Sequence, residues 1–140
     1  MTIELIPLAT VEVQFRDLIT IGAGPAGDRL IGEVSVFDVV GDRLNAHLKG
    51  VAAADWAVTS AAQVLSPDVR LAIETNDGAT IFVAYHGRVD LSRGWDEAAV
   101  YVAPRFETAV ERYRWLNTVQ AVGKGQVQGG GLRYEWYELR

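Results

Sequence analysis

Apolar and polar residues alternate one by one in three segments of the chain, 11–16, 44–49 and 132–137. A period of two residues is typical of a β-strand that buries one face. Four more segments are rich in β-branched and aromatic residues: 34–40, 69–75, 79–86 and 98–106. Together, these segments predict a sheet of many strands.

Short turn sequences separate the predicted strands, including Gly41-Asp42, Asp77-Gly78 and Gly87-Arg88. Such pairs are typical of turns between antiparallel strands. Only the segment 108–116 has a helical pattern, and parallel strands would need long crossover helices. The sequence therefore predicts an all-β fold with a single domain over residues 1–140. We expect an antiparallel β-barrel of about 8–9 strands with one short helix near residues 108–116.

The composition is that of an ordinary folded domain, with 49% hydrophobic and 22% charged residues. The formal net charge is -5 and the chain has only two lysines, which argues against binding to nucleic-acid phosphates. No apolar run is long enough to span a bilayer, and the first residues lack the pattern of a secretory signal. We therefore expect a cytoplasmic protein without a nucleic-acid or membrane partner.

Residues 22–27, Gly-Ala-Gly-Pro-Ala-Gly, match the G-x-G-x-x-G pattern of dinucleotide-binding proteins. Asp42 follows at about the distance of a ribose-binding acid. The pattern works only when the third glycine lies in a helix whose N-terminus faces the pyrophosphate, and the segment 34–40 that follows is strand-like. We therefore interpret residues 22–27 as a turn between strands and expect no cofactor.

The sequence offers little basis for metal or covalent catalysis. His47 and His86 are far apart, with no carboxylate at helical spacing, and the chain has no cysteine. None of the serines lies in the G-x-S-x-G elbow of a hydrolase. We expect no metal site and no covalent intermediate.

The hairpin over residues 69–86 contains a candidate proton-transfer group. If Asp77-Gly78 forms a two-residue turn, Glu74 lies opposite Ile81 and shares its face with Tyr85. Desolvation would then raise the pKa of the Glu74 carboxyl group, and the phenol would orient it or the ligand. A three-residue loop would instead shift the register and turn Glu74 toward solvent. The sequence is compatible with both alternatives.

Asp55 and Trp56 follow the run of small residues 51–54 and stand where a loop is expected to re-enter the sheet. Asp55 is a candidate general acid or base. The alternative is a turn in which Asp55 caps backbone N–H groups and Trp56 plugs one end of the barrel.

A second cluster of charged and aromatic residues spans 103–117. Arg105 offers a forked pair of donors to an anion, or it pairs with Glu107 or Glu74. The residues that combine apolar bulk with polar groups are Tyr113, Trp115 and Asn117. They either line the rim of a pocket or belong to the core.

Five motifs in this order resemble a known family: Gly-Pro-Ala-Gly-Asp-Arg at 24–29, Ala-Asp-Trp at 54–56, Glu-Thr-Asn-Asp-Gly-Ala at 74–79, Ala-Pro-Arg-Phe-Glu-Thr at 103–108 and Arg-Tyr-Arg-Trp-Leu-Asn at 112–117. Their order and spacing cover nearly the whole chain and resemble the bacterial and fungal family called domain of unknown function 3237. The resemblance implies an antiparallel β-barrel similar to the lipocalin-like and allene oxide cyclase-like proteins. It implies no particular activity.

Barrels of this size can hold one small ligand. We expect a cofactor-free acid–base enzyme, an isomerase, cyclase or lyase, that acts on a small hydrophobic or aromatic carbonyl compound inside the barrel. The expected catalytic residues are Glu74, Asp55 and Tyr85, and the expected substrate-binding residues are Arg29, Trp56, Arg105, Tyr113, Trp115 and Asn117. The alternative is a non-catalytic binding protein for a small apolar metabolite.

The segment 81–85 is apolar on both faces. One barrel core covers only one of these faces, so the other needs a separate cover. We therefore expect a homodimer or a higher homo-oligomer.

Overall fold

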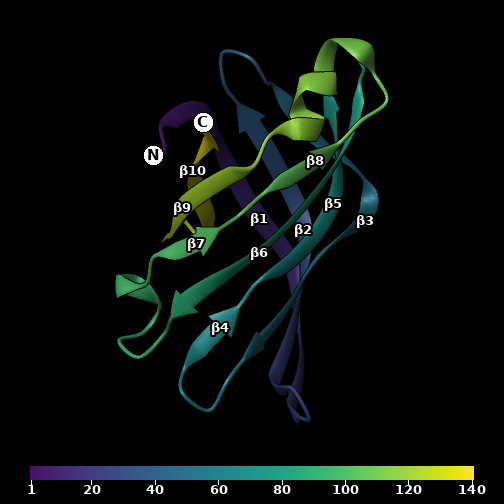
Figure 1. Cartoon of the computed structure of the whole chain (residues 1–140). Coiled ribbons are helices and arrows are strands. Elements are labelled where there is room, and N and C mark those ends of the chain that lie inside the picture. Colours follow the sequence, from purple (N-terminus) through teal and green to yellow (C-terminus); the bar gives the residue numbers. More distant parts are fainter.

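Eight antiparallel strands close into a barrel in the computed structural model, which describes all of residues 1–140 (Figure 1). In order around the barrel, the strands are β1 (Leu5–Gly24), β2 (Gly27–Val40), β3 (Ala46–Thr59), β5 (Asp68–Thr75), β6 (Thr80–Asp90), β7 (Val100–Val102), β9 (Ala121–Gln128) and β10 (Gly131–Leu139). Each strand pairs with the next, and β10 pairs with β1 to close the ring. The structure confirms the predicted antiparallel barrel.

Two short strands and two 3₁₀-helices complete the fold. β4 (Val64–Ser66) pairs with β3 and β6, and β8 (Arg105–Glu107) pairs with β6. η1 is Trp95–Glu97, and η2 (Glu111–Thr118) lies at the end of the barrel opposite the β1–β2 turn (Figure 1). The predicted short helix is thus confirmed as η2, and neither helix has the length and hydropathy of a membrane span.

The glycine-rich segment 22–27 forms the turn of the β1–β2 hairpin. β1 runs to Gly24, two residues turn the chain, and β2 begins at Gly27. A Cβ atom on Gly27 would lie 2.6 Å from the carbonyl oxygen of Thr59, so a side chain does not fit there. No helix follows the third glycine, which confirms the interpretation as a turn between strands.

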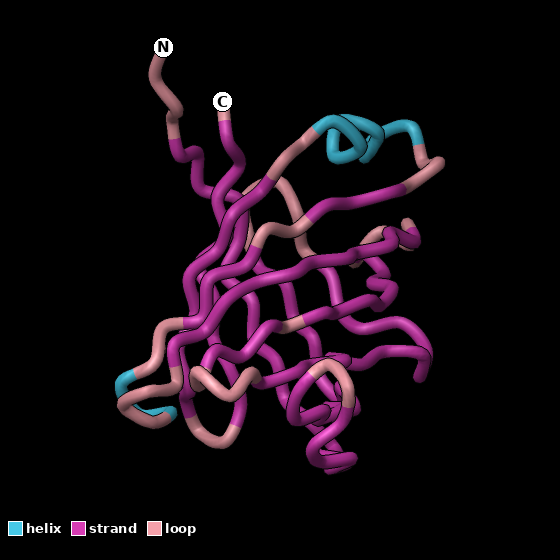
Figure 2. The backbone as a smooth tube through the Cα atoms, turned by 60° about the horizontal axis from the view of Figure 1, so that its bottom comes forward, coloured by secondary structure: helices cyan, strands magenta, loops and turns pink.

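The two ends of the chain lie side by side and help to close the barrel (Figure 2). The backbone N–H of Glu4 donates to the carbonyl of Arg140 at 2.7 Å, and the N–H of Arg140 donates back at 3.1 Å. Nearby, the guanidinium groups of Arg140 and Arg43 contact the Glu138 carboxylate at 3.1 and 2.9 Å. Hydrogen bonds from these arginines lower the pKa of Glu138, that from Arg140 most, and keep it charged.

Five buried aromatic rings fill the middle of the barrel. The ring centroid of Trp136 lies 5.9 Å from those of Phe37, Tyr85 and Phe106. Tyr134 packs edge-on against Tyr85, with 6.1 Å between the centroids. Such tilted contacts are the favoured geometry for aromatic pairs. Because these rings fill the centre of the barrel, the space for an interior pocket lies toward one end.

Glycines in β9 make room for two of these rings. Gly123 pairs with Trp136 and Gly125 pairs with Tyr134 on β10. A Cβ atom would lie 2.5 Å from Cδ1 of the opposite ring at either position. Any side chain would therefore collide with the aromatic core.

Candidate functional site

An open pocket of about 360 Å³ lies at the end of the barrel that carries the β1–β2 hairpin. Its large apolar side chains are Phe15, Leu18, Leu30, Leu65, Trp95, Val127 and Leu132. Asp55 is its only ionisable residue. Small-molecule sites typically measure about 300–1,000 Å³ and combine apolar walls with a few polar groups. The pocket therefore has the size and character of a site for a small apolar molecule.

Asp55 reaches the pocket from the middle of β3. It pairs with Gly32 on β2 and with Val69 on β5, and it faces inward together with the buried Val69. One carboxylate oxygen of Asp55, Oδ1, accepts the backbone N–H of Asp68 at 2.9 Å. The expectation that Asp55 stands in a loop is wrong, because the small residues before it continue the strand. The side chain both caps an N–H group, as one alternative predicted, and lines the pocket.

Burial in these apolar surroundings raises the pKa of Asp55 to about 6. The hydrogen bond from the Asp68 N–H opposes this change, and the negative charge of the Asp68 carboxylate adds to it. A general acid or base works best when its pKa lies near the operating pH. Asp55 is therefore suited to gain and lose a proton under near-neutral conditions.

Two buried phenols accompany Asp55. Val69 pairs with both Asp55 and Tyr85, so these three residues form a row across β3, β5 and β6 on the inner face. Burial raises the pKa of Tyr85 well above its usual value, and the neighbouring Tyr134 and the charge of Asp55 raise it further. Burial and Asp55 likewise raise the pKa of Tyr134. Both phenols thus remain protonated, and the predicted inward position of Tyr85 is confirmed.

The prediction of a two-residue turn, which would place Glu74 inside the barrel, is wrong. The Thr75 N–H donates to the Ala79 carbonyl at 2.8 Å, which closes a three-residue loop over 76–78. Glu74 consequently faces outward, where its carboxylate contacts Nζ of Lys49 at 2.6 Å. This hydrogen bond lowers the pKa of Glu74. The alternative register, with Glu74 toward solvent, is the one that forms.

Asp77 explains why the longer loop forms. Its carboxylate accepts hydrogen bonds from Nε of Arg112 at 2.7 Å, from Oγ1 of Thr75 at 2.6 Å and from the hydroxyl of Tyr113 at 2.8 Å. These bonds, that from Arg112 most strongly, hold the pKa of Asp77 well below its usual range. The network ties η2 to the loop and uses the Tyr113 hydroxyl for this purpose.

The other predicted residues near η2 also hold local structure. The guanidinium carbon of Arg43 lies over the Trp115 ring, 4.7 Å from the ring centroid. The side-chain amide of Asn117 accepts the N–H of Thr108 at 2.8 Å and donates to its carbonyl at 2.9 Å. Neither Trp115 nor Asn117 lines the pocket, which lies toward the other end of the barrel.

The two arginines and the tryptophan that were predicted to bind substrate lie on the outside of the barrel. Arg29 donates to the backbone carbonyl of Trp56 at 2.7 Å. Trp56 lies on the outer face of β3, with 40% of its surface exposed, and does not plug the barrel end. Arg105 is exposed on β8. Of the predicted site residues, only Asp55 lines the pocket, and Tyr85 lies two strands away in the same row of the inner face.

The residues that complete the pocket were not predicted as site residues. Alternation in the segment 132–137 already places Leu132, which lines the pocket, on the same face as Tyr134 and Trp136, and this was the available signal. Trp95 comes from the short helix η1 and Leu65 from the three-residue β4, and neither segment has a recognisable period. No group of three or more His, Cys, Asp or Glu side chains is arranged to hold a metal ion.

The fold and the pocket define a class of protein, the closed antiparallel barrel with an apolar pocket at one end. Residues 3–139 match the model of a family described as protein of unknown function, DUF3237. The chain therefore belongs to the DUF3237 family, which confirms the resemblance in its sequence motifs.

Several known proteins are similar to this chain. The UPF0311 protein blr7842 of Bradyrhizobium diazoefficiens is 28% identical over 122 residues, which cover 76% of this chain and 77% of that protein. The crystal structure of a β-barrel-like protein from Acinetobacter baumannii AYE has a TM-score of 0.89 at 27% identity and covers 100% of this chain and 98% of that one. An enzyme from Penicillium herquei has a TM-score of 0.77 at 19% identity, covering 99% and 94%, a likeness of fold alone.

Proposed function

We propose that this protein is a cofactor-free acid–base enzyme, an isomerase, cyclase or lyase, for a small uncharged carbonyl compound with an apolar or aromatic body. The observation that carries the proposal is the position of Asp55 as the single ionisable group in an otherwise apolar pocket. A carboxyl group desolvated in this way has a raised pKa and is a stronger base than one in water. A pocket built only to hold an apolar ligand has no need of such a group.

The lining supports an uncharged ligand. No arginine, lysine or histidine lines the pocket, and Arg29 and Arg105 lie on the outside. A ligand carboxylate would therefore lie near the charge of Asp55 without a counter-ion, which is costly away from water. The rings of Phe15 and Trp95 match a planar or aromatic body instead. An uncharged ligand needs no arginine to bind it, so the expected contacts with Arg29 and Arg105 are not part of this proposal.

The chemistry follows from Asp55 acting as a base. Its carboxylate takes a proton from the carbon next to the ligand carbonyl, and the C–H electron pair forms an enolate. Tyr85 and Tyr134 do not line the pocket, but both stay protonated and interact electrostatically with Asp55, so the dipoles of their hydroxyl groups favour negative charge that develops beside it. The Asp55 carboxyl group then returns the proton to another atom of the enolate, to a leaving group as its bond to carbon breaks, or to the alkoxide that forms when the enolate attacks a second carbonyl of the same molecule. These outcomes correspond to an isomerase, a lyase and a cyclase.

A neutral aromatic probe, 5-nitrobenzisoxazole, tests the proposal without knowledge of the natural substrate. A base removes the proton from its C3 carbon, the N–O bond breaks, and a coloured nitrile-bearing phenolate forms. We expect saturable turnover, and kcat/KM should rise with pH around a midpoint of about 6, because the ionised carboxylate is the base. Saturable binding with no turnover above that of free acetate would contradict the proposal and favour the non-catalytic binding protein.

A further inference from the structure

An apolar groove crosses the outer face of the barrel, separate from the pocket. Ile19, Ile31 and Trp56 pair with one another in a row across β1, β2 and β3. Phe82 on β6 continues the groove, with 39% of its surface exposed. Large exposed apolar patches of this kind mark interaction sites on soluble proteins. We call the residues that line it the β3 face: Ile19, Ile31, Glu33, Val51, Ala52, Ala53, Ala54, Trp56, Arg70 and Phe82.

Within the β3 face, residues 50–53 of β3 are paired neither with β2 nor with β5. The pairing of β3 with β5 stops at Lys49 and resumes at Ala54, and its pairing with β2 is interrupted over the same stretch. Gly50 has a φ of 75°, a conformation that favours glycine. Val51, which follows it, is 83% exposed. The strand therefore presents an apolar ridge beside the groove.

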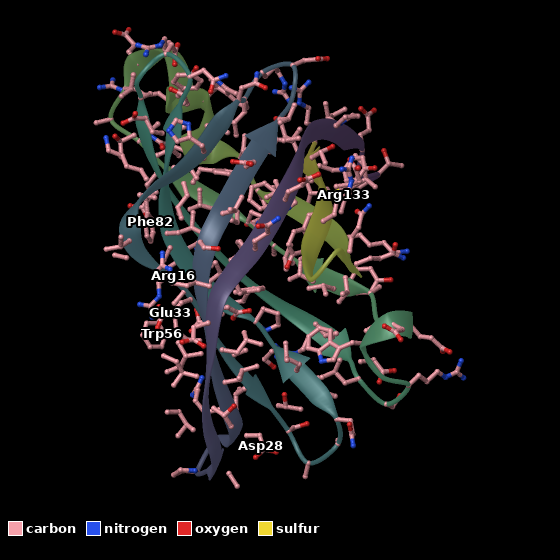
Figure 3. All side chains as sticks on the ribbon, turned by 180° about the vertical axis from the view of Figure 1, so that it is seen from behind. Arg16, Asp28, Glu33, Trp56, Phe82 and Arg133 are labelled. Carbon is pink, nitrogen blue, oxygen red and sulfur yellow. The ribbon has the colours of Figure 1, made fainter.

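Opposite charges flank the centre of the β3 face. Ala54 pairs with Glu33 on one side and with Arg70 on the other. Adjacent strands lie about 4.8 Å apart, so these two charged residues stand at similar distances on either side of β3. Arg70 takes part in none of the ion pairs of the chain, and Glu33 has only a 3.6 Å contact with the exposed Arg16. Figure 3 shows Glu33, Trp56 and Phe82 on the same flank of the barrel.

We infer that the β3 face is the interface between two copies of this chain, related by a two-fold axis that runs along β3. A rotation about this axis exchanges the two sides of the strand. It therefore places Glu33 of each copy opposite Arg70 of the other and brings the two Trp56 rings together at the centre.

The charge arrangement selects a second copy as the occupant. A two-fold interface uses the same patch on both molecules, so it must be complementary to itself. One acidic and one basic residue on either side of a common line satisfy this condition, and the apolar row between them supplies the area removed from water. A strongly acidic or strongly basic partner would match only one of the two charges.

Charge reversal tests the interface. E33R places two arginine side chains opposite each other across the interface, and R70E places two glutamates there. Each variant alone should therefore dimerise at least about tenfold more weakly than the natural protein. An equimolar mixture of the two variants restores attractive pairs in a mixed dimer. Sedimentation velocity at a series of concentrations measures the dissociation constants. E12R is the matched control, because it breaks the exposed 2.8 Å ion pair between Glu12 and Arg133 away from the β3 face.

The inference requires three results together: a dimer of the natural chain, weaker association of each reversed variant, and recovery in their mixture. E12R should dimerise as the natural protein does. A natural chain that is monomeric at 100 µM would overturn the inference. A dimer that both E33R and R70E leave unchanged would overturn it equally, since the chains would then associate through another surface. Circular dichroism spectra of the reversed variants show whether each one has folded.

Discussion

Asp55→Asn should lower kcat/KM for 5-nitrobenzisoxazole by at least about 100-fold, because general bases typically contribute 10²–10⁴-fold to such a step. The amide keeps the size of the carboxyl group, and its oxygen still accepts the Asp68 N–H, which lies 2.9 Å from Oδ1 in the natural protein. An amide does not accept a proton under these conditions. The loss therefore reports on the base and not on the shape of the pocket.

Glu74→Gln is the matched control for this experiment. Glu74 was the other carboxylate expected to transfer protons, and it faces outward in contact with Lys49. Its replacement should leave the rate of the probe reaction unchanged. If E74Q lost the reaction while D55N kept it, the assignment of the base to Asp55 would be wrong.

Asp55→Asn should also make the protein more stable at neutral pH. The folded-state pKa of Asp55, about 6, lies above the ordinary value of 3.8, so the folded chain holds the proton more tightly than the unfolded chain. Stability of the natural protein therefore falls as the pH rises from about 4 to about 6. At pH 7 this loss amounts to at most about 3 kcal/mol, and the amide avoids it.

Urea unfolding at pH 4 and pH 7 measures this effect. The difference in unfolding free energy between D55N and the natural protein should be larger at pH 7 by up to about 3 kcal/mol. An equal difference at both pH values would show that the carboxyl group has no raised pKa in the folded state. A stability cost at a functional group is expected where activity requires a buried ionisable residue.

Trp136→Ala should destabilise the fold by about 3–5 kcal/mol, the usual cost of removing a large buried aromatic side chain. Only 1% of the surface of Trp136 is exposed, and its ring contacts Phe37, Tyr85 and Phe106. Its indole N–H has no hydrogen-bond partner, so the loss comes from packing. Urea unfolding of the variant measures the change, and a loss below about 1 kcal/mol would contradict the description of the core.

Gly123→Ala probes the same packing from the other side. Its Cβ atom would lie 2.5 Å from Cδ1 of Trp136 in a ring that is enclosed, and overpacking of this kind costs about 1–3 kcal/mol. In the double variant with Trp136→Ala, the new methyl group enters the space that the ring has left. The double variant should therefore lose less stability than the two single losses combined. Gly24→Ala is the control, because a Cβ atom there would meet nothing closer than 3.9 Å.

Much of the barrel could be predicted because its strands alternate strictly. The segment 132–137 became β10, with Tyr134 and Trp136 on the inner face as the alternation indicates. β9 could not be predicted in this way, because Gly123 and Gly125 interrupt the pattern of a strand. These glycines are required by the rings on the opposite strand, a tertiary constraint that no local pattern contains.

The candidate site was predicted only in part for a similar reason. Tyr85 belongs to a strand whose inner face can be read from neighbouring residues, whereas the small residues around Asp55 do not alternate and did not predict its strand. Glu74 depends on the length of a turn, and hydrogen bonds to Asp77 from η2 set that length. The sign of a charge also does not reveal its side of the sheet, which is why Arg29 and Arg105 were expected in the pocket and lie outside it.

The carbon-13 chemical shift of the Asp55 carboxyl carbon, followed by NMR across the acid range, tests the central claim most directly. The spectrum of D55N identifies the resonance, because the signal disappears in that variant. A titration midpoint of about 6 is the result expected for a carboxyl group enclosed in an apolar pocket. A midpoint near the ordinary value of 3.8 would mean that Asp55 is solvated, and the proposed proton transfer would lose its physical basis.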